Sequence, residues 1–314
     1  MKCIYNFGIY CYKQLVALAG MRNAKARKLT QGQKDIFDYL SRKADPQGGY
    51  LWIHASSLGE FEQGRPLIEA IRKARPETRI LLTFFSPSGY EVRKNYEGAD
   101  LVCYLPFDLP GNVKRFLDLT RPTEAIFIKY EFWANYLNEL KRRNIPTYII
   151  SAIFRPKQVF FRFYGGYFRR ILRNFTHLYI QNEQSRQLLA GIGITNVSVV
   201  GDTRFDRVSD IRRSAKELPL IERFAQGKKV LIAGSSWPKD EEFLIDYFNR
   251  RDDIKLILAP HEIHESHLLF IESLLKRPAL RYTRATEAEV TACDCLIVDC
   301  FGLLSSIYRY GTLA

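Results

Sequence analysis

The feature that most constrains this fold is an alternation of short apolar runs with longer amphipathic stretches. Helix-like segments such as EQGRPLIEAIRKA at 62–74 separate the runs. Strands that alternate with helices predict an α/β fold, in which helices cover both faces of parallel sheets. The ten runs are LWIHA (51–55), RILLTFF (79–85), LVCYLPF (101–107), AIFIKY (125–130), TYIIS (147–151), HLYIQ (177–181), VSVVG (197–201), KVLIAG (229–234), IKLILAP (254–260) and CLIVDC (295–300).

The alternation is interrupted once, which predicts two units. After the seventh run the sequence is polar as far as about residue 228, and the pattern restarts at residue 229. We therefore expect one Rossmann-like domain over 26–208 and a second over 209–314, with a separate N-terminal helix over 1–25.

The N-terminal segment is apolar, aromatic and followed by basic residues. Residues 1–45 hold nine Lys and Arg against three Asp, a net charge of +6. This pattern predicts a helix that lies in the cytoplasmic face of a membrane and is held by anionic lipid. A secretory signal ending near 17–19 and a helix packed on the domain are the alternatives, and the downstream positive charge argues against export.

The whole chain is basic and its composition is globular. It has 46% hydrophobic residues, and 47 Lys and Arg against 34 Asp and Glu give a net charge of +13. Such an excess favours an anionic partner: nucleic acid, an anionic membrane or a phosphorylated substrate. The six cysteines lack the spacing of a disulfide framework or a zinc site, which favours buried cysteines in a cytosolic protein.

Residues 155–173 combine six basic and six aromatic residues with no acid. Three interpretations stay open: stacking on single-stranded nucleic acid, contact with anionic lipid, or an ordinary amphipathic helix with a solvated basic face. The arginines that we single out here are Arg155, Arg162, Arg169 and Arg170.

Polar residues follow several of the predicted strands, and ligands bind at the carboxyl ends of strands in such sheets. Glu60 follows the first run at the start of a helix, where it could interact with the helix dipole or act as a general base. Lys129 and Glu131 have the same parity, so they would share one side of an extended strand end. Arg204 could brace the domain junction or hold a phosphate.

The second half of the chain offers an anion site and a weak metal pattern. Gly234, Ser235 and Ser236 end a strand just before Pro238, so free backbone N–H groups of a helix start could hold an anion. Neither a P-loop nor a dinucleotide fingerprint is present in the sequence. Three histidines follow Pro260 at a spacing that is weak for metal, and no metal site is expected.

Seven motifs, taken in order, resemble the 3-deoxy-D-manno-octulosonic acid (Kdo) transferases of lipid A biosynthesis. They are Ser57-x-Gly59-Glu60, YLPFDLP (104–110), Glu131-Phe-Trp133-Ala-Asn135, QNE (181–183), GDTRFD (201–206), GSSWPKDEE (234–242) and APHEIHE (259–265). The resemblance runs from the N-terminal segment to the last residue, and the ordered set is far more specific than any single motif.

The resemblance implies a GT-B glycosyltransferase with two Rossmann-like domains facing a cleft. The donor would be CMP-Kdo, and the acceptor a tetraacylated lipid A precursor at the cytoplasmic side of the inner membrane. Transfer would invert the configuration, with no cofactor and no nucleic acid as a partner. The protein would be held at the membrane peripherally or by a single N-terminal anchor.

The resemblance also implies roles for single residues. Glu60 would be the general base and Arg204 would stabilise the leaving phosphate, with Lys129 and Glu131 in support. Nucleotide-binding positions would be Gly234, Ser235, Ser236, Pro260, His261, Phe301 and Gly302. Ser57, Gly59 and the four arginines singled out above would contact the acceptor or the membrane.

The chain departs from the family pattern at several positions. Lys129 stands where an acid is usual, Ala134 where proline is usual and His261 where arginine is usual. The family continues beyond this sequence into a Gly-His-Asn…Glu motif, so we expect an incomplete second domain. The alternatives are another two-domain nucleotide-sugar enzyme, which would not need residues 1–25, and a basic nucleic-acid-binding protein, which would not need Glu60.

Overall fold

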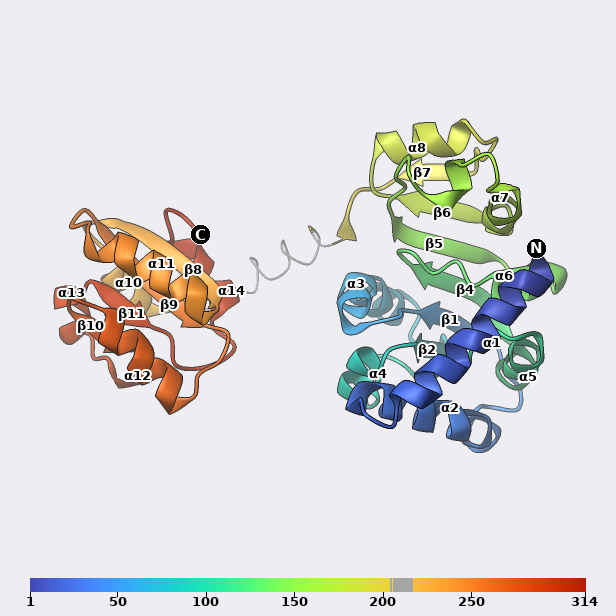
Figure 1. The fold of residues 1–314 in the computed structure, drawn as a ribbon, viewed down its shortest axis with the longest axis horizontal. Coiled ribbons are helices and arrows are strands. Elements are labelled where there is room, and N and C mark those ends of the chain that lie inside the picture. The colour runs from blue at the N-terminus through green and yellow to red at the C-terminus, as the bar shows by residue number, and fades with distance from the viewer. Residues whose placement is uncertain (204, 206–216) are drawn as a thin grey trace. The chain divides into compact units, whose positions relative to one another are not determined.

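The computed structural model describes residues 1–203, 205 and 217–314. The chain forms two compact units, residues 1–207 and 208–314 (Figure 1). Each has its own parallel sheet and its own hydrophobic clusters. Because Arg204 lies outside the described residues, its predicted role stays a prediction.

Unit 1 contains a seven-stranded sheet in the order β3-β2-β1-β4-β5-β6-β7, and every adjacent pair is parallel. The order reverses direction between β1 and β4, which is the point where ligands bind in doubly wound sheets. Its strands are β1 (Tyr50–His54), β2 (Ile80–Phe84), β3 (Leu101–Tyr104), β4 (Pro122–Ile128), β5 (Thr147–Ala152), β6 (His177–Ile180) and β7 (Val197–Val199).

Helices cover both faces of this sheet (Figure 1). They are α1 (Lys2–Ala19), α2 (Ala24–Lys43), α3 (Leu58–Ala74), α4 (Pro87–Arg93), α5 (Pro110–Thr120), α6 (Ala134–Arg142), the 3₁₀ turn η1 (Val159–Phe161), α7 (Gly166–Leu172) and α8 (Glu183–Ala190). Of the described helices, none is long and apolar enough to cross a membrane.

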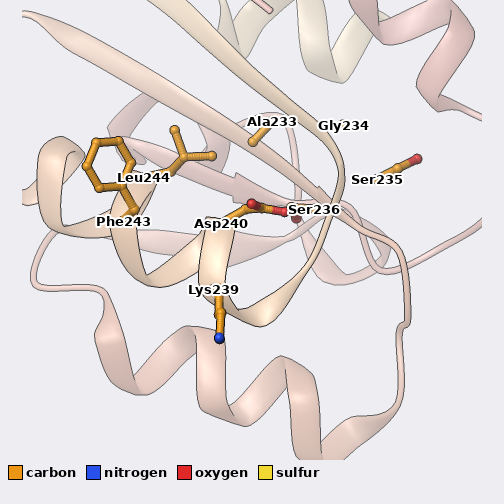
Figure 2. Close-up of a pocket in the computed structure, with 8 residues that line it drawn as sticks. All are labelled: Ala233, Gly234, Ser235, Ser236, Lys239, Asp240, Phe243 and Leu244. Atoms are coloured by element: carbon orange, nitrogen blue, oxygen red, sulfur yellow. The ribbon is translucent and has the colours of Figure 1, made fainter.

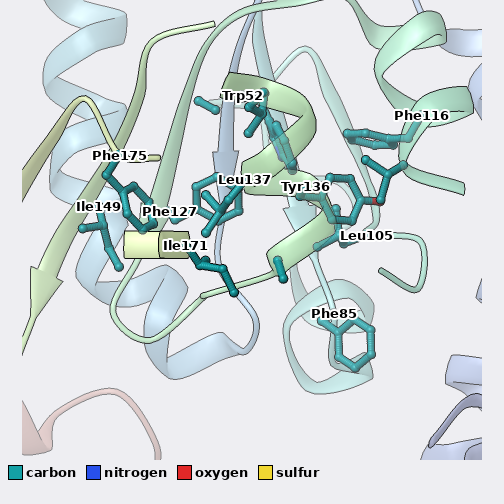
Figure 3. Close-up of a cluster of buried hydrophobic side chains, with 14 of the residues drawn as sticks. Trp52, Phe85, Leu105, Phe116, Phe127, Tyr136, Leu137, Ile149, Ile171 and Phe175 are labelled. Atoms are coloured by element: carbon teal, nitrogen blue, oxygen red, sulfur yellow. The ribbon is translucent and has the colours of Figure 1, made fainter. Parts of the chain in front are cut away.

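Alternate residues of β1 point into different clusters, as expected for a strand buried on both faces. Leu51 and Ile53 pack with α3 on one face. Trp52 is fully buried on the other face, where its ring centroid lies 5.1 Å from those of Phe116 and Phe127 (Figure 3). This aromatic core fixes β1 and β4 at the centre of the sheet, where a site would need rigid support.

Unit 2 contains a four-stranded parallel sheet in the order β10-β11-β9-β8. Its strands are β8 (Lys229–Ser236), β9 (Ile254–Pro260), β10 (Ala279–Arg281) and β11 (Cys295–Ile297). Its helices are α10 (Pro219–Phe224), α11 (Pro238–Asn249), α12 (Glu265–Leu274), η2 (Tyr282–Arg284), α13 (Glu289–Ala292), α14 (Leu304–Ile307) and η3 (Tyr308–Tyr310). Leu256 and Leu258 face α11 and α12, whereas Ile257 faces α10.

One alternative and one expectation about the chain need correction. Residues 155–173 do not form one amphipathic helix, because a 3₁₀ turn and α7 divide them around Gly165 and Gly166. A Cβ on Gly165 would lie 1.9 Å from the Val159 carbonyl oxygen, so this close turn requires glycine. The cysteines are all free, but only three are buried, and Cys3 is exposed.

Candidate functional site

Glu60 stands in the first turn of α3, directly after β1. Ser57 is the N-cap residue with extended backbone, and its N–H donates to Glu60 Oε2 at 3.1 Å. The strand therefore ends in a capped helix start, which explains the polar residues after LWIHA. The sequence offered a contact at the helix start as the alternative to a general base, and this cap is such a contact. It also fixes the position of the Glu60 carboxylate.

Glu131 lies in the segment between β4 and α6 and is buried, with 8% of its surface exposed. Its Oε2 accepts hydrogen bonds from His54 Nε2 at 3.1 Å and from Trp133 Nε1. A buried carboxylate is stable only when donors satisfy it, and here two ring N–H groups do so. β1 and β4 are neighbours, so Glu60 and Glu131 follow the two strands at the reversal point.

His54 is the residue that joins the two sides of this site, and sequence reasoning missed it. It is the last residue of β1 and is fully buried. Its Nδ1 lies 2.8 Å from Thr83 Oγ1, which also accepts from Trp52 Nε1 at 2.8 Å. The chain of contacts therefore runs from Trp52 through Thr83 and His54 to Glu131. A histidine at the last position of a buried strand was the available signal.

The environment raises the pKa of Glu60 to about 7. Burial is the main cause and the negative charge of Glu131 is the next, while His54 and the backbone N–H groups of Ser56 and Ser57 act in the opposite direction. A carboxylate with a pKa near neutrality can take a proton from a hydroxyl group more readily than an ordinary glutamate. The pair of carboxylates therefore has the chemistry of a general-base site.

Lys129 does not fit the expectation based on strand parity. β4 ends at Ile128, and Lys129 has φ 67°, in the left-handed region, so the backbone is not extended there. Two-residue periodicity therefore no longer relates its side chain to that of Glu131. Its N–H donates to the Ile150 carbonyl, which holds the turn beside β5. Its side chain has no hydrogen-bond or ion-pair partner within the described parts of the chain.

In unit 2 the predicted anion site forms a pocket of about 380 Å³ (Figure 2). It lies between the end of β8 and the first turns of α11, and Ser235 is exposed with φ 55°. Gly234 permits close packing here, because a Cβ would lie 2.1 Å from the Tyr308 hydroxyl. The pocket is lined by Ala233, Gly234, Ser235, Ser236, Lys239, Asp240, Phe243 and Leu244.

Two side chains beside this pocket already have partners. Ser236 Oγ donates to the buried Glu241 at 2.9 Å, so this hydroxyl supports the strand end. Asp240 accepts from the Trp237 N–H at 3.1 Å, which uses one of the free amides at the start of α11. The exposed polar side chains on the pocket wall are Ser235, Lys239 and Asp240, and of these Ser235 and Lys239 can donate to an anion. They are the groups best placed to meet an anion.

The histidines after β9 take separate partners. The ring of His261 packs against that of Trp237, with centroids 4.4 Å apart and planes tilted by 30°, and the backbone N–H of His261 donates to the Ser236 carbonyl. His264 contacts Glu262, and His267 contacts Glu241 at 2.6 Å. Within the described residues no group of three or more His, Cys, Asp or Glu could hold a metal ion.

His267 is protonated readily in this setting. Burial lowers its pKa, but hydrogen bonds to Glu241 and to the Glu262 carbonyl outweigh burial and raise it. Its Nδ1 lies 2.8 Å from the Glu262 carbonyl and its Nε2 lies 2.6 Å from Glu241. The His267 side chain therefore ties α12 to α11 and to the segment after β9.

The remaining predicted nucleotide positions lie at the carboxyl edge of the same sheet. Pro260 ends β9 and pairs with Ser236 of β8. Phe301 and Gly302 follow β11; Phe301 is 74% exposed and Gly302 has φ 88°. Neither residue is among those that line the pocket, so the structure brings Pro260 and His261 to β8 but leaves Phe301 and Gly302 in the loop after β11.

The basic segment in unit 1 presents an aromatic tip. Phe163 is 94% exposed and Tyr164 is 59% exposed. Arg169 donates to the carbonyls of Phe160 and Arg162, so this arginine holds the turn. Arg155, Arg162 and Arg170 are exposed. The surface could therefore contact an anionic ligand through three of the four predicted arginines.

Comparison with solved structures identifies the class of fold. The crystal structure of UDP-GlcNAc 2-epimerase from Neisseria meningitidis, bound to UDP-GlcNAc, is similar with a TM-score of 0.55 and 13% identity. The alignment covers 83% of this chain and 74% of that one. The prediction of an α/β chain with two Rossmann-like units is confirmed.

Comparison of sequences then identifies the family. Residues 25–207 match the family described as 3-deoxy-D-manno-octulosonic-acid transferase (kdotransferase), and the chain belongs to this family. A 3-deoxy-D-manno-octulosonic acid transferase of Haemophilus influenzae is 22% identical over 98% of this chain and 74% of its own length. The sequence-based identification of a Kdo transferase is thereby confirmed at the level of the family.

A further relative is longer than this chain. The bifunctional glycosyltransferase/methyltransferase of Fusobacterium nucleatum is 26% identical over 84% of this chain, and the matched part is 43% of its own length. The chain thus corresponds to less than half of that relative.

Proposed function

We propose that this chain transfers Kdo from CMP-Kdo to a tetraacylated lipid A precursor, with inversion and with Glu60 as the general base. The observation that carries the proposal is the position of Glu60 at the reversal point of the unit 1 sheet, with a pKa raised to about 7 beside the buried Glu131. Membership of the Kdo transferase family indicates that the transferred sugar is Kdo.

The proposed reaction is a single displacement. The acceptor hydroxyl oxygen bonds to the anomeric carbon of Kdo while the bond from that carbon to the CMP phosphate oxygen breaks. The electron pair of the broken bond leaves with the phosphate, and the hydroxyl proton passes to Glu60. His54 and Trp133 donate hydrogen bonds to Glu131, and the charge of Glu131 raises the pKa of Glu60, which makes Glu60 more basic for this transfer.

The donor is proposed to bind unit 2 at the carboxyl ends of its strands. The pocket between β8 and α11 offers Ser235, Lys239 and the helix start to the phosphate. The packed rings of Trp237 and His261 lie at the same strand ends, where a pyrimidine ring could pack against them. Arg204 is proposed to meet the charge that develops on the leaving phosphate.

The acceptor is proposed to be presented by the cytoplasmic side of the inner membrane. One face of α1 exposes Ile4, Phe7, Leu15 and Leu18 at 59–69% of their surface. The exposed aromatic tip and arginines of 155–173 belong to the same unit. An apolar face with basic residues nearby suits an anionic lipid surface, and it is consistent with peripheral attachment.

A transfer assay tests the proposal. The purified 314-residue chain is incubated with CMP-Kdo and the tetraacylated precursor, and the mass of the acceptor is measured. We expect a gain of whole Kdo units. Glu60→Gln should lower turnover at least about 100-fold, because it removes the base, while leaving CMP-Kdo affinity unchanged.

The matched control is Glu62→Gln, two residues along the same helix. Glu62 pairs with Arg93 at 2.8 Å, so its loss should change turnover less than about twofold. An acceptor of unchanged mass would contradict the proposed function of this chain. A Glu60→Gln variant with lost donor affinity and retained turnover would contradict the assigned base.

A further inference from the structure

Helix α1 is attached to unit 1 by polar contacts as well as by apolar packing. The hydroxyl group of Tyr5 donates to Asp108 Oδ2 at 2.6 Å and accepts from the backbone N–H of Ala134 at 3.2 Å. Asn6 Oδ1 accepts from Asn135 Nδ2 at 2.9 Å. All of these partners lie next to the start of α6, directly after the segment that carries Glu131.

The start of α6 has no cap from its own sequence. Trp133 occupies the N-cap position and makes no side-chain cap bond. The fully buried Asp108 accepts instead from the N–H groups of Asn135 and Tyr136, both at 3.0 Å. Together with Tyr5 it satisfies the first three amides of the helix, which would otherwise lose hydrogen bonds in a buried place.

A second line of contacts reaches the same segment through aromatic rings. The Tyr12 ring lies 6.3 Å from Phe85, and Phe85 lies 4.9 Å from Trp133. Trp133 in turn donates its indole N–H to Glu131. Residues of α1 therefore contact Ala134 and Asn135 directly through hydrogen bonds, and they reach Trp133 indirectly through the ring of Phe85.

We propose that α1 is a working part of the active site, in which Tyr5 is a positioning residue for the segment 131–134 and hence for Glu131. The inference rests on the proposed function and goes beyond it, because it assigns α1 a role that does not depend on a membrane. The outward face of the helix is free to contact lipid while its inward face holds the site.

The test compares Tyr5→Phe with Tyr10→Phe, both assayed in detergent micelles, where attachment to a bilayer is not required. Tyr10 is on the same helix, 51% exposed and without a hydrogen-bond partner within the described residues. We expect Tyr5→Phe to lower kcat roughly fivefold to thirtyfold, as the loss of one or two buried hydrogen bonds predicts. Tyr10→Phe should stay within twofold of the wild type.

Two readouts separate positioning from general damage. In Tyr5→Phe the amides of 134–136 should exchange with deuterium faster, while exchange in the core of β1 stays unchanged. The acid limb of the kcat profile should move to lower pH, because Glu131 no longer lies firmly beside Glu60. The groups that shift the pKa of Glu60, besides its burial, are Glu131, His54 and the backbone N–H groups of Ser56 and Ser57.

A second substitution should restore the turnover that Tyr5→Phe loses. Proline at position 134 has no N–H to satisfy and suits the first position of a helix. Tyr5→Phe combined with Ala134→Pro should therefore recover most of the lost turnover. Unchanged exchange and unchanged kcat in Tyr5→Phe would overturn the inference. A wild-type chain that transfers no Kdo would refute the proposed function instead, and the exchange data would still decide whether Tyr5 holds the segment.

Discussion

At the residue scale, the position of Glu60 is compatible with both roles that the sequence left as alternatives, the helix-start contact and the proposed general base. One carboxylate oxygen accepts from the Ser57 N–H, as an acidic residue in a first helical turn often does. The same geometry holds the carboxylate beside the charge of Glu131. A cap contact therefore does not exclude a base; it restricts the rotamers of the side chain and fixes the direction from which a hydroxyl group can approach.

Glu131→Gln tests this coupling of charges. Glu60 must be ionised to act as a base, so turnover should rise with pH through its pKa of about 7. Removing the neighbouring negative charge lowers this pKa, and the acid limb of the kcat profile should move to lower pH. Burial, the larger cause, remains, so the limb should stay above the ordinary glutamate range.

The control for this profile is Glu183→Gln, a carboxylate at the start of α8 that pairs with Arg186 on the surface. It should leave the acid limb where the wild type has it. An acid limb that does not move in Glu131→Gln would show that Glu131 has no influence on the titrating group.

The sequence predicted that Glu60 and Glu131 belong to the site. It did not predict that His54 and Trp133 donate hydrogen bonds to Glu131. His54 contacts residues 29 and 77 positions away along the chain, and such partners follow only from the order of strands. The prediction that Lys129 and Glu131 share one side of an extended strand failed for a local reason. Lys129 has positive φ, which breaks the strand alternation, and nothing in the run AIFIKY indicates this.

At the scale of elements, the packing of α3 on β4 is the contact that brings Glu60 and Glu131 together. Gly64 of α3 is buried, and a Cβ there would lie 2.0 Å from Ile128 Cδ1 at the end of β4. Gly64→Ala should push the helix away from the strand. We expect a loss of roughly 1–2 kcal/mol in the free energy of unfolding after the gain in helix propensity, measured by urea titration.

Turnover should fall with Gly64→Ala as well, because α3 carries the proposed base. Gly111→Ala is the matched control: it lies in α5 with no atom within 4 Å of the added Cβ, so stability should rise slightly or stay the same. If both variants were equally stable, the close contact between α3 and β4 would make no measurable difference to the free energy of unfolding.

Most of the elements could be predicted, and the exceptions have physical causes. All ten apolar runs became strands, and for strands buried on both faces, such as β1 and β9, the reason is that they leave a continuous apolar signal. β10 was missed because it has only three residues and because an arginine such as the buried Arg281 is usually a surface residue. Arg281 is neutralised by Glu265 and Glu272 of α12, a pairing that no local pattern indicates.

At the scale of the whole molecule, charge and apolar surface should act together at a membrane. The net charge of +13 attracts anionic lipid, and the outward leucines of α1 can leave water on contact. We expect the chain to bind vesicles that contain about one third phosphatidylglycerol, and binding should weaken as salt rises because salt screens exposed charges. Vesicle co-sedimentation at several salt concentrations measures this.

The apolar share of this binding can be separated from the electrostatic one. Leu15→Ser with Leu18→Ser removes two side chains from the outward face of α1, and each contributes roughly 1–2 kcal/mol if it enters the lipid, so affinity should fall more than about tenfold. Leu269→Ser in unit 2 removes a leucine of similar exposure, 53%, and should leave binding unchanged. If both changes weakened binding equally, α1 would not be the membrane contact. If the double variant also kept its turnover in detergent while Tyr5→Phe lost it, the two faces of α1 would have separate functions: the outward face for lipid and the inward face for the catalytic carboxylates.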